Sequence, residues 1–248
     1  ALQEQALTTV KDACAPQLKN SEIKQGVQTL QDQMSCPFKG FVRRLKIQDF
    51  EAEHLGFNRA EQGVLVHKIL ETLFTEISSA EALKALSEES INRLIKSHTM
   101  RAITNTDQNY QSIERNRIIR LIKQYLILEK QRSDFKVVAT ESIVEVCIEG
   151  LSFTTKLDRM DQLENGDRLI IDYKTGQSAL SQITGEAIEQ AQLPIYAISN
   201  EVDGVAFAQI NASECVYKAV ARNREILPSS KQAQSKIEKA GGKISPRS

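Results

Sequence analysis

Residues 154–176 read TTKLDRMDQLENGDRLIIDYKTG, and the predicted fold follows from this stretch. Two segments rich in apolar and β-branched residues flank the turn-forming pair Asn165 and Gly166, which predicts an antiparallel hairpin. Asp172 and Lys174 stand two apart near the end of the second strand, so their side chains project from the same face. In isolation such a pair is usually a salt bridge at a strand end, so its meaning depends on its neighbours in the sheet.

The length of the hairpin loop fixes which residues face one another across the two strands. A two-residue loop pairs Glu164 with Asp167 and mixes polar with apolar side chains on each face. A three-residue loop, with Gly166 in the left-handed region, pairs Leu163 with Asp167 and separates polar from apolar. Because the hydrophobic pattern sets strand register, the sequence predicts the three-residue loop.

In that register Asp158 lies opposite Asp172, and the next residues of the same face bring Lys156 opposite Lys174. Asp161 is three residues from Asp158, so it faces the other way and lies nearer the turn. The predicted apolar face consists of Phe153, Leu157, Leu169, Ile171 and Tyr173.

A two-residue loop at 149–150 extends the same register to the preceding strand and places Glu141 opposite Asp158. Glu141, Asp158 and Asp172 then form one line across three strands, which we call the acidic row. Neighbouring strands are about 5 Å apart, so these carboxylates cannot all stay ionised in a partly buried site unless a cation joins them. Such oxygen ligands suit Mg²⁺ or Mn²⁺, and Lys174 beside them would act as an electrophile or orient water. The acidic row therefore predicts metal-assisted attack of water on a phosphodiester.

The remainder of the chain predicts a helical amino-terminal half and a mixed sheet, an α+β or α/β architecture. On the first expected helix, Val64, His67 and Leu70 share the inner face. A histidine on such an apolar face, taken alone, is more often a buried structural residue than a metal ligand. The expected helices are 61–74, 80–98, 110–132 and, after the first three strands, 185–200. The expected strands are 136–150, 151–164, 167–174, 204–212 and 214–220.

The composition leaves the partner open. The 248 residues contain 32 Lys plus Arg and 32 Asp plus Glu, so a nucleic-acid surface would have to be a local patch. No apolar run is long enough to span a membrane, and no signal peptide opens the chain. The first residue is Ala1 rather than Met, which is expected of a processed chain or of a domain cut from a longer protein. The four cysteines form no C-x-x-C pair, which argues against a zinc site and for a reducing compartment, the cytoplasm.

The helix expected over 110–132 has a polar face with several basic residues. Either this face is solvated or it is a basic stripe, and the interspersed Glu114 and Glu129 favour a solvated face. Its basic residues are Arg115, Arg117, Arg120, Lys123, Lys130 and Arg132.

These motifs together resemble a known family. KLDRMDQLENGDRLIIDYKTG, followed by QLPIYA and preceded by GVLVHKILETLF, resembles the nuclease domain of the RecB and AddB family within the PD-(D/E)xK nuclease superfamily. The resemblance covers about residues 36–220. It implies an α/β, restriction-endonuclease-like fold with a mixed central sheet flanked by helices, and a Mg²⁺-dependent (or Mn²⁺-dependent) DNA exonuclease of repair or recombination. The implied domain is 36–222, with a helical segment or linker at 1–35 and a polar tail at 223–248.

By position, the resemblance implies that Asp158 and Asp172 bind the metal and that Lys174 is the catalytic lysine. His67 would be a further ligand, and Glu141 matches an acid found before the second motif's strand. The superfamily's nominal proline before the first aspartate is Leu157 here. The Q-x-x-x-Y pair, which would contact substrate and support the lysine, is Gln192 and Tyr196. The proposed DNA contacts are Arg115, Arg120, Lys123 and Lys156.

The resemblance also bears on cofactors and partners. CPFKGF, at Cys36–Phe41, resembles the start of AddB-type domains, where such a cysteine helps hold an iron–sulfur cluster. Only Cys215 follows the nuclease motifs, and a [4Fe–4S] cluster takes four thiolates, so no cluster is expected in this chain. The chain has no P-loop, and the expected partners are single-stranded or end-containing DNA and a helicase subunit or domain.

Two other functions fit parts of the pattern. One is a non-catalytic nuclease-like module that binds DNA or scaffolds a helicase. Such a module would be expected to have lost an acid or the lysine, whereas Asp158, Asp172 and Lys174 are all present. An unrelated metal-dependent phosphoesterase or RNase could use a similar sheet. DNA cleavage is the one function that uses every motif counted.

Overall fold

A five-stranded mixed sheet organises the chain, with the strand order β1-β2-β3-β4-β5. The pairings are antiparallel except between β3 and β4, which run parallel. The strands are β1 Phe135–Ile148, β2 Leu151–Leu163, β3 Arg168–Lys174, β4 Gly204–Ile210 and β5 Cys215–Ala221. The computed structural model describes residues 26–45, 47, 56–104, 108–148, 151–179, 192–199, 202–222 and 226–227.

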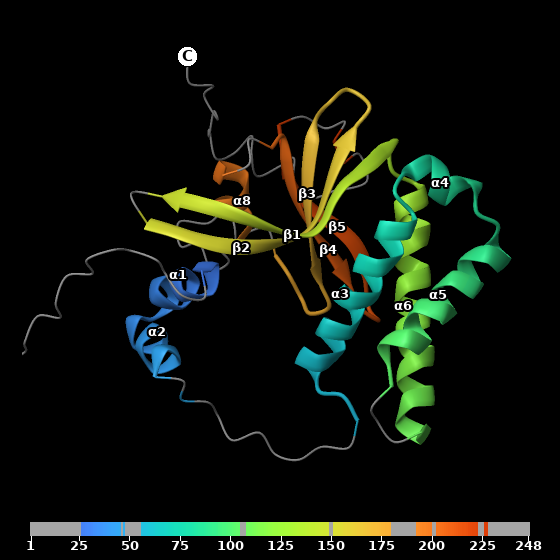
Figure 1. Cartoon of the computed structure of the whole chain (residues 1–248), viewed down its shortest axis with the longest axis horizontal. Helices are drawn as coiled ribbons and strands as arrows, with labels where there is room; N and C mark the ends of the chain where they lie inside the picture. The colour runs from blue at the N-terminus through green and yellow to red at the C-terminus, as the bar shows by residue number, and fades with distance from the viewer. Residues whose placement is uncertain are drawn as a thin grey trace, which may run out of the picture.

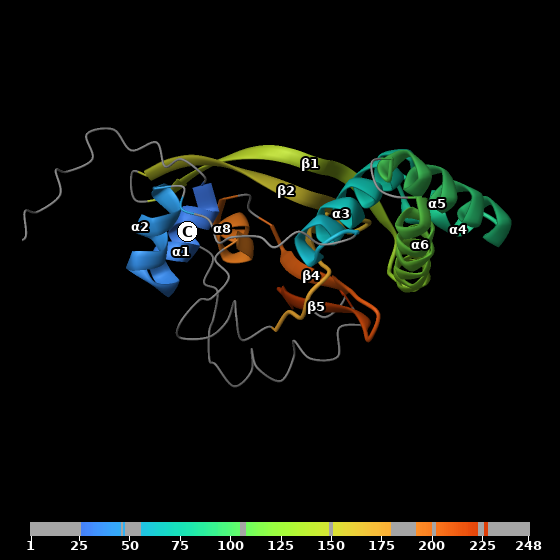
Figure 2. The same ribbon diagram turned by 90° about the horizontal axis from the view of Figure 1, so that it is seen from below.

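Helices cover the sheet on both sides, as Figures 1 and 2 show. Helices α3, α4, α5 and α6 gather at one side in Figure 1, and α1, α2 and α8 lie below the far ends of β1 and β2 in Figure 2. The helices are α1 Gly26–Ser35, α2 Pro37–Arg44, α3 Arg59–Glu76, α4 Ala80–Ala85, α5 Glu88–Ala102, α6 Gln108–Lys130 and α8 Gln192–Ser199. This arrangement confirms the predicted α/β, restriction-endonuclease-like fold with a helical amino-terminal half. No helix in the described ranges is long and apolar enough to cross a membrane.

The predicted hairpin register is confirmed. Arg159 pairs with Ile171, and the Leu163 N–H donates to the Asp167 carbonyl at 2.9 Å, as a three-residue loop requires. Gly166 has φ of 89°, the left-handed conformation that glycine adopts without steric cost. Among the described residues the β2–β3 ladder ends at Arg159, one step before Asp158.

The predicted apolar face is only partly correct. The side chains of Leu169, Ile171 and Tyr173 join the main core with α3, α5 and α6. Leu157 instead packs in a second cluster with α8 residues, and Phe153 packs in a third with α1. The reason is that β1 and β2 are 14 and 13 residues long, so they pass from the α3 side to the α8 side along their length (Figure 2).

Two helix predictions need correction. The stretch 80–98 forms two helices rather than one, because Ser79 and Ser87 each cap a separate helix through the N–H three residues on. Val64, expected on the inner face of α3, is 69% exposed, and the core-facing residues are Val66, Ile69, Leu70, Leu73 and Phe74. Asn58 and Glu61 form the capping box that starts this helix.

The polar face of α6 is not wholly solvated. Glu129 is fully buried, and so nearly is Arg132, which follows the end of the helix by two residues. Both lie against Arg159 and Asp161, which are fully buried and face away from Asp158, as predicted for Asp161. Two arginines and two carboxylates therefore form a buried ionic network between α6 and β2. We call these four residues the buried network.

Candidate active site

The main chain of Tyr173 orients two side chains of the acidic site at once. The Tyr173 N–H donates to Asp158 Oδ2 at 2.7 Å, where the main-chain ladder of β2 and β3 has ended. His67 Nε2 lies 2.9 Å from the Tyr173 carbonyl. A carbonyl only accepts hydrogen bonds, so Nε2 carries the hydrogen. This leaves Nδ1 as the atom that faces the site.

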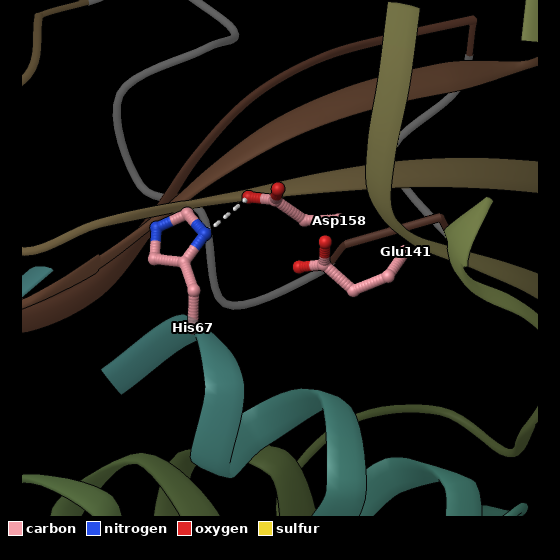
Figure 3. Close-up of side chains that lie close together, drawn as sticks. All are labelled: His67, Glu141 and Asp158. Atoms are coloured by element: carbon pink, nitrogen blue, oxygen red, sulfur yellow. Dashed lines mark ion pairs between the residues drawn. The ribbon is translucent and has the colours of Figure 1, made fainter. Parts of the chain in front are cut away.

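His67 Nδ1 lies 3.4 Å from Asp158 Oδ2, the pair drawn with a dashed line in Figure 3. In neutral His67 this atom carries a lone pair turned toward a carboxylate, an arrangement that a proton on Nδ1 or a metal ion held by both groups would stabilise. Burial lowers the pKa of His67, but the charges of Asp158, Asp172 and Glu141 raise it more, and the net result is a raised pKa. The histidine predicted from α3 is therefore beside the acidic row.

Glu141 reaches the same place from β1. Its neighbours Thr140 and Ser142 pair with Arg159 and Leu157, so Glu141 stands beside Asp158 as predicted. It adopts φ of 48°, a left-handed conformation that is rare and costly for a non-glycine residue within a strand. Ligand atoms of His67, Glu141 and Asp158 all lie within 4.8 Å of one another, and Figure 3 shows the three side chains converging.

Asp172 and Lys174 form the ion pair expected at the end of β3, with Lys174 Nζ 2.7 Å from Asp172 Oδ2. Asp172 is 1% exposed. Burial raises the pKa of Asp172 to about 6, with a further contribution from Asp158, while Lys174 opposes the rise. The Lys174 side chain is 27% exposed and can reach solvent or a ligand from this position.

Gln192 and Tyr196 lie one turn apart on α8 and are bonded to each other. Gln192 Nε2 donates to the Tyr196 hydroxyl at 2.9 Å. That hydroxyl donates to the main-chain carbonyl of Lys156 and lies 3.1 Å from the Thr155 hydroxyl. In this structure the pair therefore supports β2 next to Asp158 rather than Lys174, and its contact with substrate stays a prediction.

The four predicted DNA contacts lie in two places. Lys156 projects from β2 two residues before Asp158 and forms an ion pair with Glu141. The other three are on α6, where Arg115 Nη2 donates to the Ile103 carbonyl at 2.6 Å, Arg120 is exposed and Lys123 is partly buried. Helix α6 packs against the sheet face that carries Tyr173, so these three lie on the side opposite to Asp172.

Some residues that shape the site carry no sequence motif for it. The Tyr173 peptide orients His67 and Asp158 through main-chain atoms, for which the sequence has no signal. Gln209, which pairs with Lys174 across β3 and β4, accepts hydrogen bonds from the N–H and hydroxyl of Ser178. This contact ties down the turn that follows the lysine.

The donor set of the site fits a divalent metal ion. Its carboxylates are hard oxygen donors, and Nδ1 of His67 is the nitrogen left free by the hydrogen bond to a carbonyl. Histidine ligands in metal sites usually donate their second N–H in this way. The raised pKa of Asp172 shows that burial and the nearby Asp158 disfavour its negative charge, which a bound cation would stabilise.

Comparisons with known proteins give a family and two remote structural likenesses. A model of the PD-(D/E)XK nuclease superfamily matches residues 26–242. No curated protein matches the sequence. The crystal structure of SSO0001 is 12% identical, covers 85% of this chain and 84% of that one, and has a TM-score of 0.29. A proposed exonuclease from Eubacterium rectale is 10% identical, with coverages of 85% and 76% and a TM-score of 0.37. With such TM-scores, the family match alone carries the assignment.

Proposed function

Because the chain belongs to the PD-(D/E)XK nuclease superfamily, we propose that it is a Mg²⁺- or Mn²⁺-dependent deoxyribonuclease that acts on DNA ends. The observation that carries this proposal is the convergence of His67, the acidic row and Lys174 at one point of the sheet. The same proposal has further parts, which the sequence supports. They are RecB/AddB-type character, a role in repair or recombination, a helicase partner, cytoplasmic location and the domain limits 36–222.

We propose His67 Nδ1 and the carboxylates of Asp158 and Asp172 as metal ligands, with Glu141 as a fourth donor or a neighbour of the ligands. Donor atoms of His67, Asp158 and Glu141 lie within 4.8 Å of one another, whereas the role of Asp172 rests on the family motif. When bound, a divalent ion would polarise the phosphodiester and lower the pKa of a water molecule. The protein's contribution is orientation: the Tyr173 peptide fixes one nitrogen of His67 and one oxygen of Asp158 before any ligand arrives.

Lys174 is the proposed catalytic cation. In the structure its ammonium is held by Asp172 at 2.7 Å. If Asp172 held a divalent ion, this ion pair would weaken, and Lys174 would be available to the phosphate or the attacking water. Hydrolysis adds the water oxygen to phosphorus and breaks one phosphorus–oxygen bond, and the negative charge that develops is stabilised by the Lys174 ammonium.

DNA is proposed to approach across Lys156 and along the basic residues of α6. Lys and Arg side chains bind phosphates, and such binding weakens as the salt concentration rises. The α6 contacts, Arg115, Arg120 and Lys123, lie on the opposite side of the sheet from Asp172, so a strand that uses them must pass around the sheet edge.

The proposal is tested by incubating the protein with single- and double-stranded DNA, labelled at either end, in Mg²⁺, Mn²⁺ or EDTA. We expect cleavage that depends on the metal and falls by about 10²-fold or more in Lys174→Ala. The matched control is Lys84→Ala, which removes an exposed lysine paired with Asp134 at 2.5 Å on α4, and should cleave like the wild type.

Cleavage that persists in Lys174→Ala would overturn the assigned mechanism. Binding of DNA without cleavage in either metal would support the alternative, a non-catalytic nuclease-like module that scaffolds a helicase. Circular single-stranded DNA separates the remaining possibilities, since an exonuclease that needs an end leaves it intact.

A further inference from the structure

Lys156, like Lys174, forms an ion pair with an acid that a divalent metal ion would also use. Its ammonium forms an ion pair with Glu141 Oε2, and the two side chains differ greatly in exposure. Glu141 is 12% exposed and Lys156 is 55% exposed, so the lysine reaches in from solvent to an enclosed carboxylate. The pair is therefore open to exchange from the solvent side.

The backbone of Lys156 is fixed while its ammonium is free to move. The Lys156 carbonyl accepts a hydrogen bond from the Tyr196 hydroxyl, and Gln192 holds that hydroxyl in turn. The side chain beyond this anchor is a flexible four-carbon stem on the same strand face as Asp158. Lys156 can thus change partners without moving the strand that carries the acidic row.

The ion pairs of the site show what a divalent cation would change at Lys156. Two carboxylates of the acidic row pair with lysines, Glu141 with Lys156 and Asp172 with Lys174, while Asp158 lies beside His67. A divalent cation brings two positive charges, Lys174 supplies the third, and a histidine that binds a metal is neutral. The charge of Lys156 is then surplus at Glu141 and suits a DNA phosphate.

We infer that Lys156 couples cation binding to DNA binding: it is the counter-ion of Glu141 in the cation-free site and binds a DNA phosphate once a divalent cation is present. This inference rests on the proposed function and adds a regulation of the same site. By linkage the effect is reciprocal, so DNA that engages Lys156 also strengthens binding of the cation.

Two affinities test the inference without any measurement of cleavage. The first is the affinity for Mn²⁺ alone, followed by electron paramagnetic resonance of the free ion. We expect Lys156→Gln to bind Mn²⁺ about three- to tenfold more tightly than the wild type, because the competing ammonium is gone. The charge-matched control is Lys68→Gln, which removes an exposed lysine next to His67 that pairs with Glu71 instead, and should shift the affinity less than about twofold.

The second affinity is that for short fluorescent single-stranded DNA, measured by anisotropy at fixed low salt in EDTA and in Ca²⁺, with the DNA checked for integrity. In EDTA we expect Lys156→Gln to match the wild type within about twofold. In Ca²⁺ we expect it to bind about three- to tenfold more weakly, since only then is the wild-type lysine released to a phosphate. Lys156→Arg keeps the charge and should keep the difference between the two conditions.

Equal Mn²⁺ shifts in Lys156→Gln and Lys68→Gln would overturn the inference, because a general charge effect would explain both. An equal loss of DNA affinity in EDTA and in Ca²⁺ would overturn it as well. A wild-type protein that neither binds Mn²⁺ nor cleaves DNA refutes the proposed function together with the inference. A wild type that does both, with a Lys156→Gln variant that behaves like the control, refutes the inference alone.

Discussion

Replacing Arg159 by methionine removes one charge from the buried network and should destabilise the fold strongly. The Arg159 guanidinium contacts Asp161 through two hydrogen bonds of 2.6 and 2.7 Å, and it contacts Glu129 at 2.9 Å. Arg132 pairs with the same two carboxylates at 2.8 and 3.0 Å, so the four charges sum to zero. Without Arg159, two fully buried carboxylates share one arginine and a net negative charge remains in the core.

The expected loss follows from the burial of that charge. At an effective dielectric constant of about 20, a pair of charges about 4 Å apart contributes about 4 kcal/mol, which desolvation largely offsets in the intact network. Removing one partner leaves the desolvation cost without its compensation, and such changes destabilise by roughly 3–5 kcal/mol. The control is Arg93→Met, which breaks an exposed pair with Glu89 at 3.3 Å and should change the free energy of unfolding by less than about 1 kcal/mol.

The assay is urea unfolding followed by circular dichroism at pH 7.5 and at pH 5.5. In Arg159→Met the uncompensated carboxylate gains a pKa above its unfolded value, so the folded state takes up a proton more readily than the unfolded state. The destabilisation should therefore shrink as the pH falls. A second variant, Arg159→Met with Asp161→Asn, leaves Arg132 paired with Glu129 and should lose less than the two single changes summed. A loss below about 1 kcal/mol, or one insensitive to pH, would refute the role assigned to the network.

Three further changes test the site. Asp172→Asn should stabilise the metal-free protein above pH 6, because burial raises the pKa of Asp172 to about 6 and the charged carboxylate opposes folding. The gain in the free energy of unfolding is at most about 3 kcal/mol. In thermal melts this gain should vanish as the pH falls toward 4. Tyr196→Phe removes the hydroxyl that donates to Lys156, and should lower stability by about 1 kcal/mol and slow cleavage more than a matched change at the distant Tyr110. Gly63→Val should reduce cleavage about tenfold with a small effect on melting, since even a Cβ there lies 3.3 Å from the Thr175 hydroxyl, next to the proposed catalytic residue Lys174. Unchanged kinetics would show that this close approach has no role.

The hairpin could be predicted because its two signals agree. Asn165 and Gly166 mark the turn, and only the three-residue loop separates polar from apolar residues. That register sufficed to bring Asp158 beside Asp172 and to send Asp161 to the other face, as the structure confirms. Local pattern therefore determined the part of the site that two adjacent strands build.

Other features depend on contacts distant in sequence or on backbone geometry. The pairing of Arg159 with Glu129 spans 30 positions between a strand and a helix, and periodicity carries no information about it. The left-handed Glu141 occurs where no glycine or asparagine announces such a conformation. The division of 80–98 is different, because Ser87 is a recognised helix-capping residue and its signal was present in the sequence.

The two faces of β3 explain why the site and the buried network are linked. Asp172 and Lys174 point toward the site, whereas Ile171 and Tyr173 point into the core between the sheet and α6. A slip of one residue would exchange these sets, burying Lys174 in the core and exposing Tyr173. Arg159 pairs directly with Ile171 and is locked to α6 by charge, so the network opposes this slip. The peptide that orients His67 and Asp158 therefore keeps its position because ionic contacts on the opposite face hold the strand register.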